Sequence, residues 1–480
     1  METKTDTSQP GDTSSSHVEE QALEIRIDPA KEAKVVRKLD IFITPVCFIV
    51  YLSCFLDRAN IGNVKVAGMP KDIGASAQQF STAVSIFYAT YVPVEIPAVI
   101  LSKRFEPRFL LTFLCIVWSA TTIANGFIHN VTGLYVCRLV LGACEGGVFP
   151  TLNLYLTMVY KRDEMAKRVS FLLSCMALSG AVGGLLAYGL LQMNGIAGLA
   201  GWKWVYIMEG AFSIVCVFAV WFGLPNDIRQ AYFFTAEERE IMELRHQQRL
   251  AYLGSAEFDW NEIKLAFKDF KVWICAATQF CQNILTYGFG TFLPSILNAM
   301  GYDQLASNYL TIPVYVFGAA GFFTFAFLSD KYQKCGPLML CSNVFGIIGY
   351  SILVGVNNNA VKYFACYFIA HAVYTGTGLN LAWINVNLAP QYRRATGIGI
   401  HQAVGNTAGI VAGQIYRTAP YRLGNSFSLG TILVAEILIT IHLLYLGRRN
   451  KEKEQILSGQ KADTRKKKTG DREADFRYRV

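Results

Sequence analysis

The stretch IFITPVCFIVYLSCFLDRANIGN, residues 41–63, combines a long apolar run with two adjacent charges, Asp57 and Arg58. It is as long as the roughly 20 residues that a helix needs to cross a bilayer. A charge in hydrocarbon costs about 2.5–3.5 kcal/mol on insertion scales. The stretch therefore predicts a membrane helix whose charges lie against polar partners or a water-filled cavity.

The composition of the whole chain indicates a helical membrane protein that crosses the bilayer many times. Of its 480 residues, 52% are hydrophobic and 16% are charged, whereas a soluble protein carries about 25% charged residues. The mean hydropathy is +0.30. Most of the 12 cysteines lie inside apolar runs and form no metal-type cluster. We expect them to be small buried residues, and we expect no metal and no cofactor.

Apolar runs bounded by charges and turn residues predict about twelve membrane spans. The expected spans are 39–62, 80–101, 109–128, 133–158, 168–191, 203–224, 272–298, 306–329, 338–356, 360–388, 394–416 and 426–447. The polar insert contains TAEEREIMELRHQQRL at 235–250, where a threonine and acids precede helical spacing, so we expect a surface helix. The expected domains are a polar N-terminal segment 1–38, a six-helix bundle 39–224, a linker 225–271, a second bundle 272–447 and a basic tail 448–480.

The distribution of basic residues predicts the orientation. Alternate loops are basic, and the basic residues are Lys103, Arg104, Arg108, Lys161, Arg162, Lys167, Lys331, Lys334, Arg393 and Arg394. The positive-inside rule then places both termini in the cytoplasm. The segment from Arg448 onward has 12 Lys and Arg against 6 Asp and Glu. We expect a solvated tail or contact with an anionic inner leaflet, and no nucleic acid.

Short matches between the two halves indicate a duplicated six-span unit. LSKRF at 101–105 matches LSDKY at 328–332, and KRVS at 167–170 matches RRAT at 393–396. The offsets of these matches are nearly equal. Repeated six-span units with a binding site between them are common in secondary transporters.

These features resemble the major facilitator superfamily. LDRANIGN at 56–63, EIP at 95–97 and RLVLGACEGGVFP at 138–150 resemble its anion:cation symporter branch. The polar insert and APYRLGNSF at 419–427 resemble the fungal allantoate-permease group of that branch. The resemblance implies an all-α membrane fold of about twelve transmembrane helices in two pseudo-symmetric six-helix bundles. It also implies the plasma membrane, and we expect a monomer.

The charged residues predict a cavity between the first and fourth spans. Asp57 and Arg58 point about 100° apart on a helix and cannot neutralise each other well. Arg138 and Glu145 are seven residues apart and share a helix face. We expect all four around one cavity. The alternative is an ion-pair network that only holds the helices together.

Chemistry assigns roles to these charges. Burial favours the protonated form of a carboxylic acid, so Asp57 and Glu145 suit proton coupling. A guanidinium stays charged and offers a two-pronged contact, so Arg58 and Arg138 suit a carboxylate substrate. The resemblance implies the same division of roles.

Uncharged polar residues are expected to line the opposite wall. We predict substrate contacts from Tyr91, Asn385, Gln402 and Asn406, and Tyr91 also resembles the substrate-contacting tyrosine of the family. For any single amide, the alternative is an interhelical hydrogen bond worth about 0.6 kcal/mol. Glu95, Glu209, Glu436 and His401 receive no role at this stage.

The predicted function is proton-coupled symport of a small organic anion across a lipid bilayer by alternating access. One alternative is an exporter or exchanger of a carboxylate-bearing secondary metabolite, because the same cavity serves both directions. Another is a membrane sensor that binds the anion without moving it, but neither flank resembles a large signalling domain. The sequence has no nucleophile–base pair and no nucleotide-binding loop, so we do not expect an enzyme.

Overall fold

The computed structural model describes residues 27–254, 260–463 and 470–480. The polar stretch before residue 27 and the RKKK run at 465–468 lie outside this range. Within it, the chain folds into α-helices and short 3₁₀ turns, and no strand is found. The expectation of an all-α fold is confirmed.

The first half of the chain forms six rods, some of which consist of two successive helices. They are α2 (Pro29–Phe42) with α3 (Thr44–Val66), α5 (Ala77–Arg104), α6 (Pro107–Asn125), α7 (Val131–Gly146) with α8 (Val148–Val159), α9 (Arg162–Leu173) with α10 (Cys175–Leu191), and α11 (Gly201–Gly223). The short α4 (Met69–Asp72) and η1 (Ile196–Gly198) lie in the connections. Each rod overlaps one of the first six expected spans.

The second half repeats this pattern after η2 (Ile228–Gln230) and two linker helices, α12 (Ala236–Gly254) and α13 (Trp260–Phe267). Its rods are α14 (Phe270–Ala299), α15 (Gln304–Tyr309) with α16 (Thr311–Tyr332), α17 (Gly336–Gly355), α18 (Asn359–Val386), α19 (Gln391–Asn406) with α20 (Ala408–Ile415), and α21 (Arg422–Leu457). A last 3₁₀ turn, η3 (Gly470–Arg472), precedes the described end of the chain.

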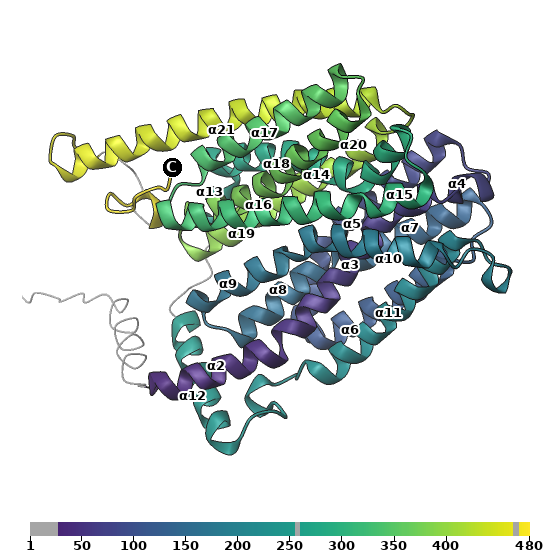
Figure 1. Cartoon of the computed structure of the whole chain (residues 1–480). Helices are drawn as coiled ribbons and strands as arrows, with labels where there is room; N and C mark the ends of the chain where they lie inside the picture. Colours follow the sequence, from purple (N-terminus) through teal and green to yellow (C-terminus); the bar gives the residue numbers. More distant parts are fainter. Residues whose placement is uncertain (1–26, 255–259, 464–469) are drawn as a thin grey trace, which may run out of the picture.

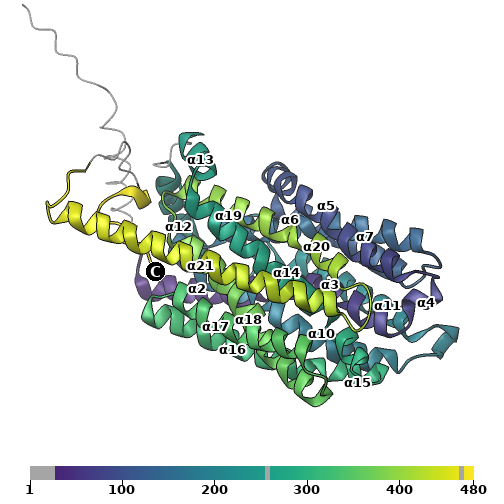
Figure 2. The same ribbon diagram turned by 90° about the horizontal axis from the view of Figure 1, so that it is seen from above.

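The rods run side by side in two groups (Figure 1). Helices of the first half, purple to teal, form the lower group, and helices of the second half, green to yellow, form the upper group. In both views α12, α13 and the C-terminus lie at one end of the rods, while α4 and α15 lie at the other (Figure 2). We name these the α12 end and the α4 end.

Eight helical segments among the described residues are long and apolar enough to cross a membrane by length and composition alone. The other rods carry polar residues on their buried faces. Helix α14, for example, buries Gln279, Gln282 and Asn283 within its 30 residues. Buried polar groups lower the hydropathy of a span without shortening it, which is typical of helices that line a polar interior.

The linker helix α12 begins as the sequence predicts. Thr235 Oγ1 accepts a hydrogen bond from the Glu238 amide, and the Glu238 carboxylate accepts one from the Thr235 amide, at 3.4 and 2.9 Å. This reciprocal cap satisfies two amides that the first turn leaves free. Farther along α12, Arg245 contacts Glu32 of α2 at 2.5 Å and Glu164 of α9 at 2.7 Å. These ion pairs fasten the linker to the first half.

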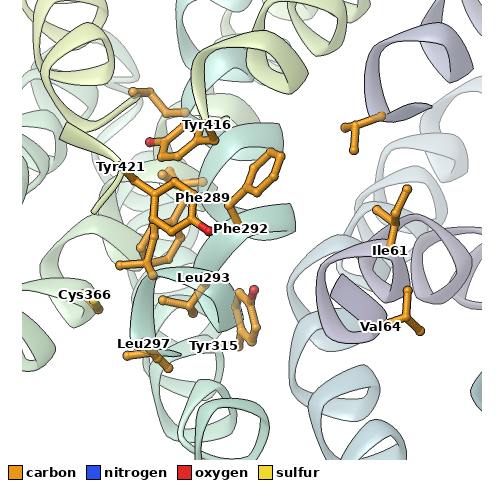
Figure 3. Close-up of a cluster of buried hydrophobic side chains, with 14 of the residues drawn as sticks. Ile61, Val64, Phe289, Phe292, Leu293, Leu297, Tyr315, Cys366, Tyr416 and Tyr421 are labelled. Carbon is orange, nitrogen blue, oxygen red and sulfur yellow. The ribbon is translucent and has the colours of Figure 1, made fainter. Parts of the chain in front are cut away.

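The two halves meet closely at the α4 end. A Cβ at Gly62 of α3 would lie 1.8 Å from the Thr291 carbonyl oxygen of α14, so only glycine permits this crossing. Lys65, one turn farther along α3, lies over Phe292 with its Nζ 4.6 Å from the ring centroid. Figure 3 shows Ile61 and Val64 on α3 at one side of the view and Phe289 and Leu293 of α14 at the other, and all four belong to one cluster of buried apolar residues.

The end of the chain is not a freely solvated tail, and that expectation is wrong for residues 470–480. Asp471 is fully buried and pairs with Lys271 of α14 and Arg393 of α19. Arg479 exchanges backbone hydrogen bonds with the Asn387 side chain, 2.8 Å for the bond that its amide donates. The carboxylate supplies the negative charge that two buried cations require, which draws the segment onto the α12 end of the second half.

Replacing Gly62 with alanine should destabilise the crossing of α3 and α14. The added methyl group overlaps a backbone oxygen, and overpacking of this kind costs about 1–3 kcal/mol. Heating the purified protein with a thiol-reactive dye measures this, because nearly all described cysteines are buried until the protein unfolds. Gly62→Ala should unfold at a lower temperature. Gly430→Ala is the control, since a Cβ there meets nothing within 4 Å. Equal unfolding temperatures for the two variants would contradict the crossing.

Replacing Asp471 with asparagine should release the C-terminal segment. The change removes the counter-ion that Lys271 and Arg393 share and leaves each cation with one acidic neighbour, Asp269 or Glu262, so the loss should stay below the value of about 3–5 kcal/mol for a wholly uncompensated buried charge. Limited trypsin digestion should then cleave after Arg472 and Arg477 faster than in the unaltered protein. Asp475→Asn alters an exposed acid of the same segment and should leave the cleavage rate unchanged. Equal rates in both variants would show that the charge does not hold the segment.

Candidate functional site

The candidate site lies where α3 passes between neighbours of both halves. The adjacent residues Asp57 and Arg58 point to different helices, as their 100° separation requires. Arg58 Nε donates a hydrogen bond to Glu145 Oε2 of α7 at 2.7 Å. Asp57 instead accepts hydrogen bonds from Trp118 and Thr122 of α6. Of these four charges, Arg58 lines the cavity described below, and the arrangement of all four around one cavity stays a prediction.

Close packing of α5 against α7 brings Glu145 to Arg58. A Cβ at Gly142 would lie 2.1 Å from the Phe87 carbonyl oxygen, and one at Gly146 would lie 2.4 Å from that of Tyr91. These glycines let the two backbones touch. Glu145, between them in sequence, is 1% exposed and has no space to turn toward lipid.

Aromatic rings surround the guanidinium of Arg58. Its Cζ lies 4.5 Å from the ring centroid of Tyr91, 5.0 Å from that of Phe55 and 5.6 Å from that of Phe87. Each ring face attracts a cation. One guanidinium nitrogen, Nη2, is buried and has no hydrogen-bond partner in the described residues. Arg58 thus retains an unused donor beside Glu145.

A cavity adjoins Arg58 and encloses about 450 Å³ together with its opening. Its wall comes from both halves of the chain. The lining residues are Phe55, Arg58, Ala59, Tyr88, Met176, Ser179, Gly180, Thr286, Tyr287, Gly290, Thr291, Tyr315 and Tyr374. The space that a water-sized sphere can occupy inside it is about 50 Å³, which is below the range of small-molecule sites, and the wall carries five aromatic rings and one cation.

A hydrogen-bonded chain links the cavity wall to a further acid. Tyr287 of α14 donates to Asn406 Oδ1 at 2.8 Å, and Asn406 Nδ2 donates to Glu95 Oε1 of α5 at 2.6 Å. Tyr88 contacts Tyr287 with ring centroids 4.8 Å apart. The sequence left Glu95 without a role, and in the structure its carboxylate accepts a hydrogen bond from the amide of Asn406.

Two other predicted residues do not join this group. Asn385 is exposed near the end of α18, and it does not line the cavity. Gln402 accepts a hydrogen bond from His401 Nδ1 at 3.2 Å. His401 is itself fully buried against Asn380, so these residues form an interhelical contact. That is the alternative stated above for single polar residues in a span.

Arg138 also lies away from the cavity wall. Its Nη2 donates to the Tyr206 hydroxyl of α11 at 3.0 Å, and its Nε has no partner among the described residues. Its charge acts on Asp57. Glu209, left without a role by the sequence, lies on α11 against the Asp57 carboxyl group. The charged residues of the first half therefore form two groups, one at the cavity and one inside the bundle.

Comparisons with known proteins agree with this architecture. Residues 47–413 match the family model described as Major Facilitator Superfamily. An uncharacterized transporter of Schizosaccharomyces pombe is 44% identical over 456 residues, with 95% of each chain covered. The high-affinity nicotinic acid transporter of Saccharomyces cerevisiae is 33% identical, with 89% of this chain and 80% of the relative covered.

Solved structures show the same fold at low sequence identity. A bacterial homolog of the human lysosomal transporter Spinster, inward-facing and unoccupied, has a TM-score of 0.66 at 15% identity and covers 87% of this chain and 97% of its own. A D-xylose–proton symporter has a TM-score of 0.65 at 14% identity and covers 82% and 97%. The chain therefore belongs to the Major Facilitator Superfamily and is a secondary transporter rather than an enzyme.

Proposed function

We propose that the protein is a proton-coupled symporter of a small organic anion, in the anion:cation symporter branch and near the allantoate-permease group. The observation that carries the proposal is Arg58, a buried cation on the cavity wall with one nitrogen that has no hydrogen-bond partner among the described residues. A carboxylate can take that nitrogen in a charge-assisted hydrogen bond. Glu145, already paired with Arg58, would bind the coupling proton and release Arg58 for the substrate.

The shape and chemistry of the wall favour a flat aromatic carboxylate. Tyr88 and Tyr287 offer ring faces to the cavity, and Tyr315 and Tyr374 extend the aromatic wall. A planar ring can stack on such faces while its carboxylate meets Arg58. The similarity to a nicotinic acid transporter makes nicotinate the first substrate to test. Tyr91 would act by holding the guanidinium, and Asn406 would orient Tyr287.

We also propose an orientation and a conformational state. Basic residues at the α12 end support a cytoplasmic location for that end and for both termini, in a plasma-membrane transporter. The bundles 39–224 and 272–447 would then rock about the cavity, joined by the linker 225–271, within a monomer. Because the halves are closed at the α4 end, the structure corresponds to an inward-facing state.

The test is uptake of labelled nicotinate by proteoliposomes with an imposed pH gradient. Accumulation should require an inward proton gradient, and unlabelled nicotinate should compete far better than nicotinamide, which lacks the charge. Equal competition by acid and amide would remove the basis for an anion site. Accumulation that ignores the proton gradient would remove the coupling.

Arg58→Lys should raise the KM for nicotinate roughly tenfold or more. A lysine ammonium is a point charge and cannot contact Glu145, the aromatic rings and a carboxylate in one plane. The lost charged hydrogen bond is worth about 1.5–3 kcal/mol, which accounts for the expected rise in KM. Arg449→Lys is the matched control, because Arg449 pairs with Glu452 near the end of α21. An unchanged KM in Arg58→Lys would return Arg58 to a structural role.

Glu145→Gln should abolish accumulation driven by the proton gradient while exchange of labelled for unlabelled nicotinate continues. The amide keeps the shape of the side chain but cannot gain or lose a proton. Uptake against a substrate gradient and counterflow are measured on the same vesicles. If the variant still accumulates nicotinate uphill, Glu145 is not the coupling acid.

A further inference from the structure

The charged group of Asp57, Arg138 and Glu209 inside the first half is separate from the cavity and contains one more acid than base. Asp57 and Glu209 are 3% and 4% exposed. One turn away from each, the hydroxyl groups of Ser53 and Ser213 lie 3.0 Å apart, so α3 and α11 touch at this level and the two carboxyl groups are neighbours. Neither Asp57 nor Glu209 lines the cavity. The two residues come from α3 and α11, and Asp57 points about 100° away from Arg58 on α3.

The hydrogen bonds around this pair are unequal. Trp118 and Thr122 donate to one oxygen of Asp57, Oδ2. The other oxygen of Asp57 and both oxygens of Glu209 are buried without a donor in the described part of the chain. A buried carboxylate with no donor is strongly disfavoured, since nothing replaces its lost hydration.

The balance of charges around the pair also disfavours two ionised carboxyl groups. Arg138, 2% exposed, is the cation that acts on Asp57. The other titratable groups that interact with the pair are Tyr206 and Cys216 of α11, Cys54 of α3 and Glu145 of α7. Glu145 is already engaged with Arg58. One positive charge balances one carboxylate, so the second carboxyl group must be neutral.

We propose that Asp57 and Glu209 hold one proton between them, and that this pair is a proton-binding site outside the substrate cavity. A proton between the two carboxyl groups provides the donor that both lack, as adjacent carboxylates cannot both ionise. The proton is a property of the pair rather than of either residue. Arg138 controls it, because a closer approach of its charge would favour the doubly ionised pair.

This site would serve the proton coupling proposed above, yet its occupancy can be measured without transport. Infrared spectroscopy of the purified full-length protein in lipid nanodiscs at neutral pH detects the carbonyl stretch of a protonated carboxylic acid. We expect one such band to disappear in Glu209→Gln and to disappear or shift in Asp57→Asn. Trp118→Phe, which alters neither acid, should shift the same band by removing a donor to Asp57.

Glu436→Gln is the matched control. Glu436 is a membrane acid of α21 that contacts Asn343 of α17, and both residues lie in the second half of the chain, away from the Asp57–Glu209 pair. That variant should leave the band of the pair in place. A band unchanged in Glu209→Gln would overturn the proposal. A second outcome would also overturn it. If Glu209→Gln removes the band but Asp57→Asn and Trp118→Phe leave it unchanged, Glu209 holds a proton alone. Size-exclusion profiles confirm that each variant is folded. A protein with the band but without proton-driven uptake would contradict the proposed function and leave the shared proton standing.

Discussion

The neighbouring charges of Asp57 and Arg58 determine how helix α3 packs. Neither can face lipid without a large penalty, and neither can satisfy the other from adjacent positions on a helix. Arg58 therefore turns to Glu145 and the rings of α5, whereas Asp57 turns to α6 and α11. Helix α3 is held from two sides, and the remaining side meets the second half of the chain through Gly62.

This division separates two kinds of electrostatic environment within a few residues. Arg58 is 10% exposed at its side chain and borders a cavity, so its charge remains available to a molecule that enters. Asp57 lies behind it among buried groups that only a proton can reach. A single helix thus presents an anion-binding surface and an acid site that are adjacent but differ in access.

Much of the fold could be predicted from the sequence, because membrane spans depend on local composition. The rods, the cap of α12 and the burial of most cysteines all follow from patterns within a few residues. The pairing of Arg58 with Glu145 was harder to predict. Seven-residue spacing shows that Arg138 and Glu145 share a face, but not that a glycine-mediated approach of α5 would turn Glu145 toward α3. Tyr91 contacts Arg58 and Asn406 contacts Tyr287, and the substrate contacts predicted for both residues stay predictions.

Other parts of the site could not be predicted because they depend on contacts between distant segments. Glu209 is one acid in an apolar span, and only the packing of α11 against α3 gives it a partner. Glu95 meets Asn406 across the two halves. The sequence does not decide which face of α18 carries the exposed Asn385, because that depends on how the helix packs, and its predicted substrate contact stays a prediction. The signal that could have identified Glu209 is the count of charges, since three acids face two arginines.

The docked C-terminal segment has a consequence for how it can detach. Asp471 contacts Lys271 and Arg393 together, while Lys453 donates to the backbone oxygens of both Asp471 and Phe476. Arg393 also pairs with Glu262, and Lys271 lies 3.6 Å from Asp269, so each cation keeps an acidic neighbour when the Asp471 carboxylate leaves. While it is docked, the segment joins α14, α19 and α21 through Lys271, Arg393 and Lys453. Detachment therefore separates three helices of the second half at the α12 end from their shared contact.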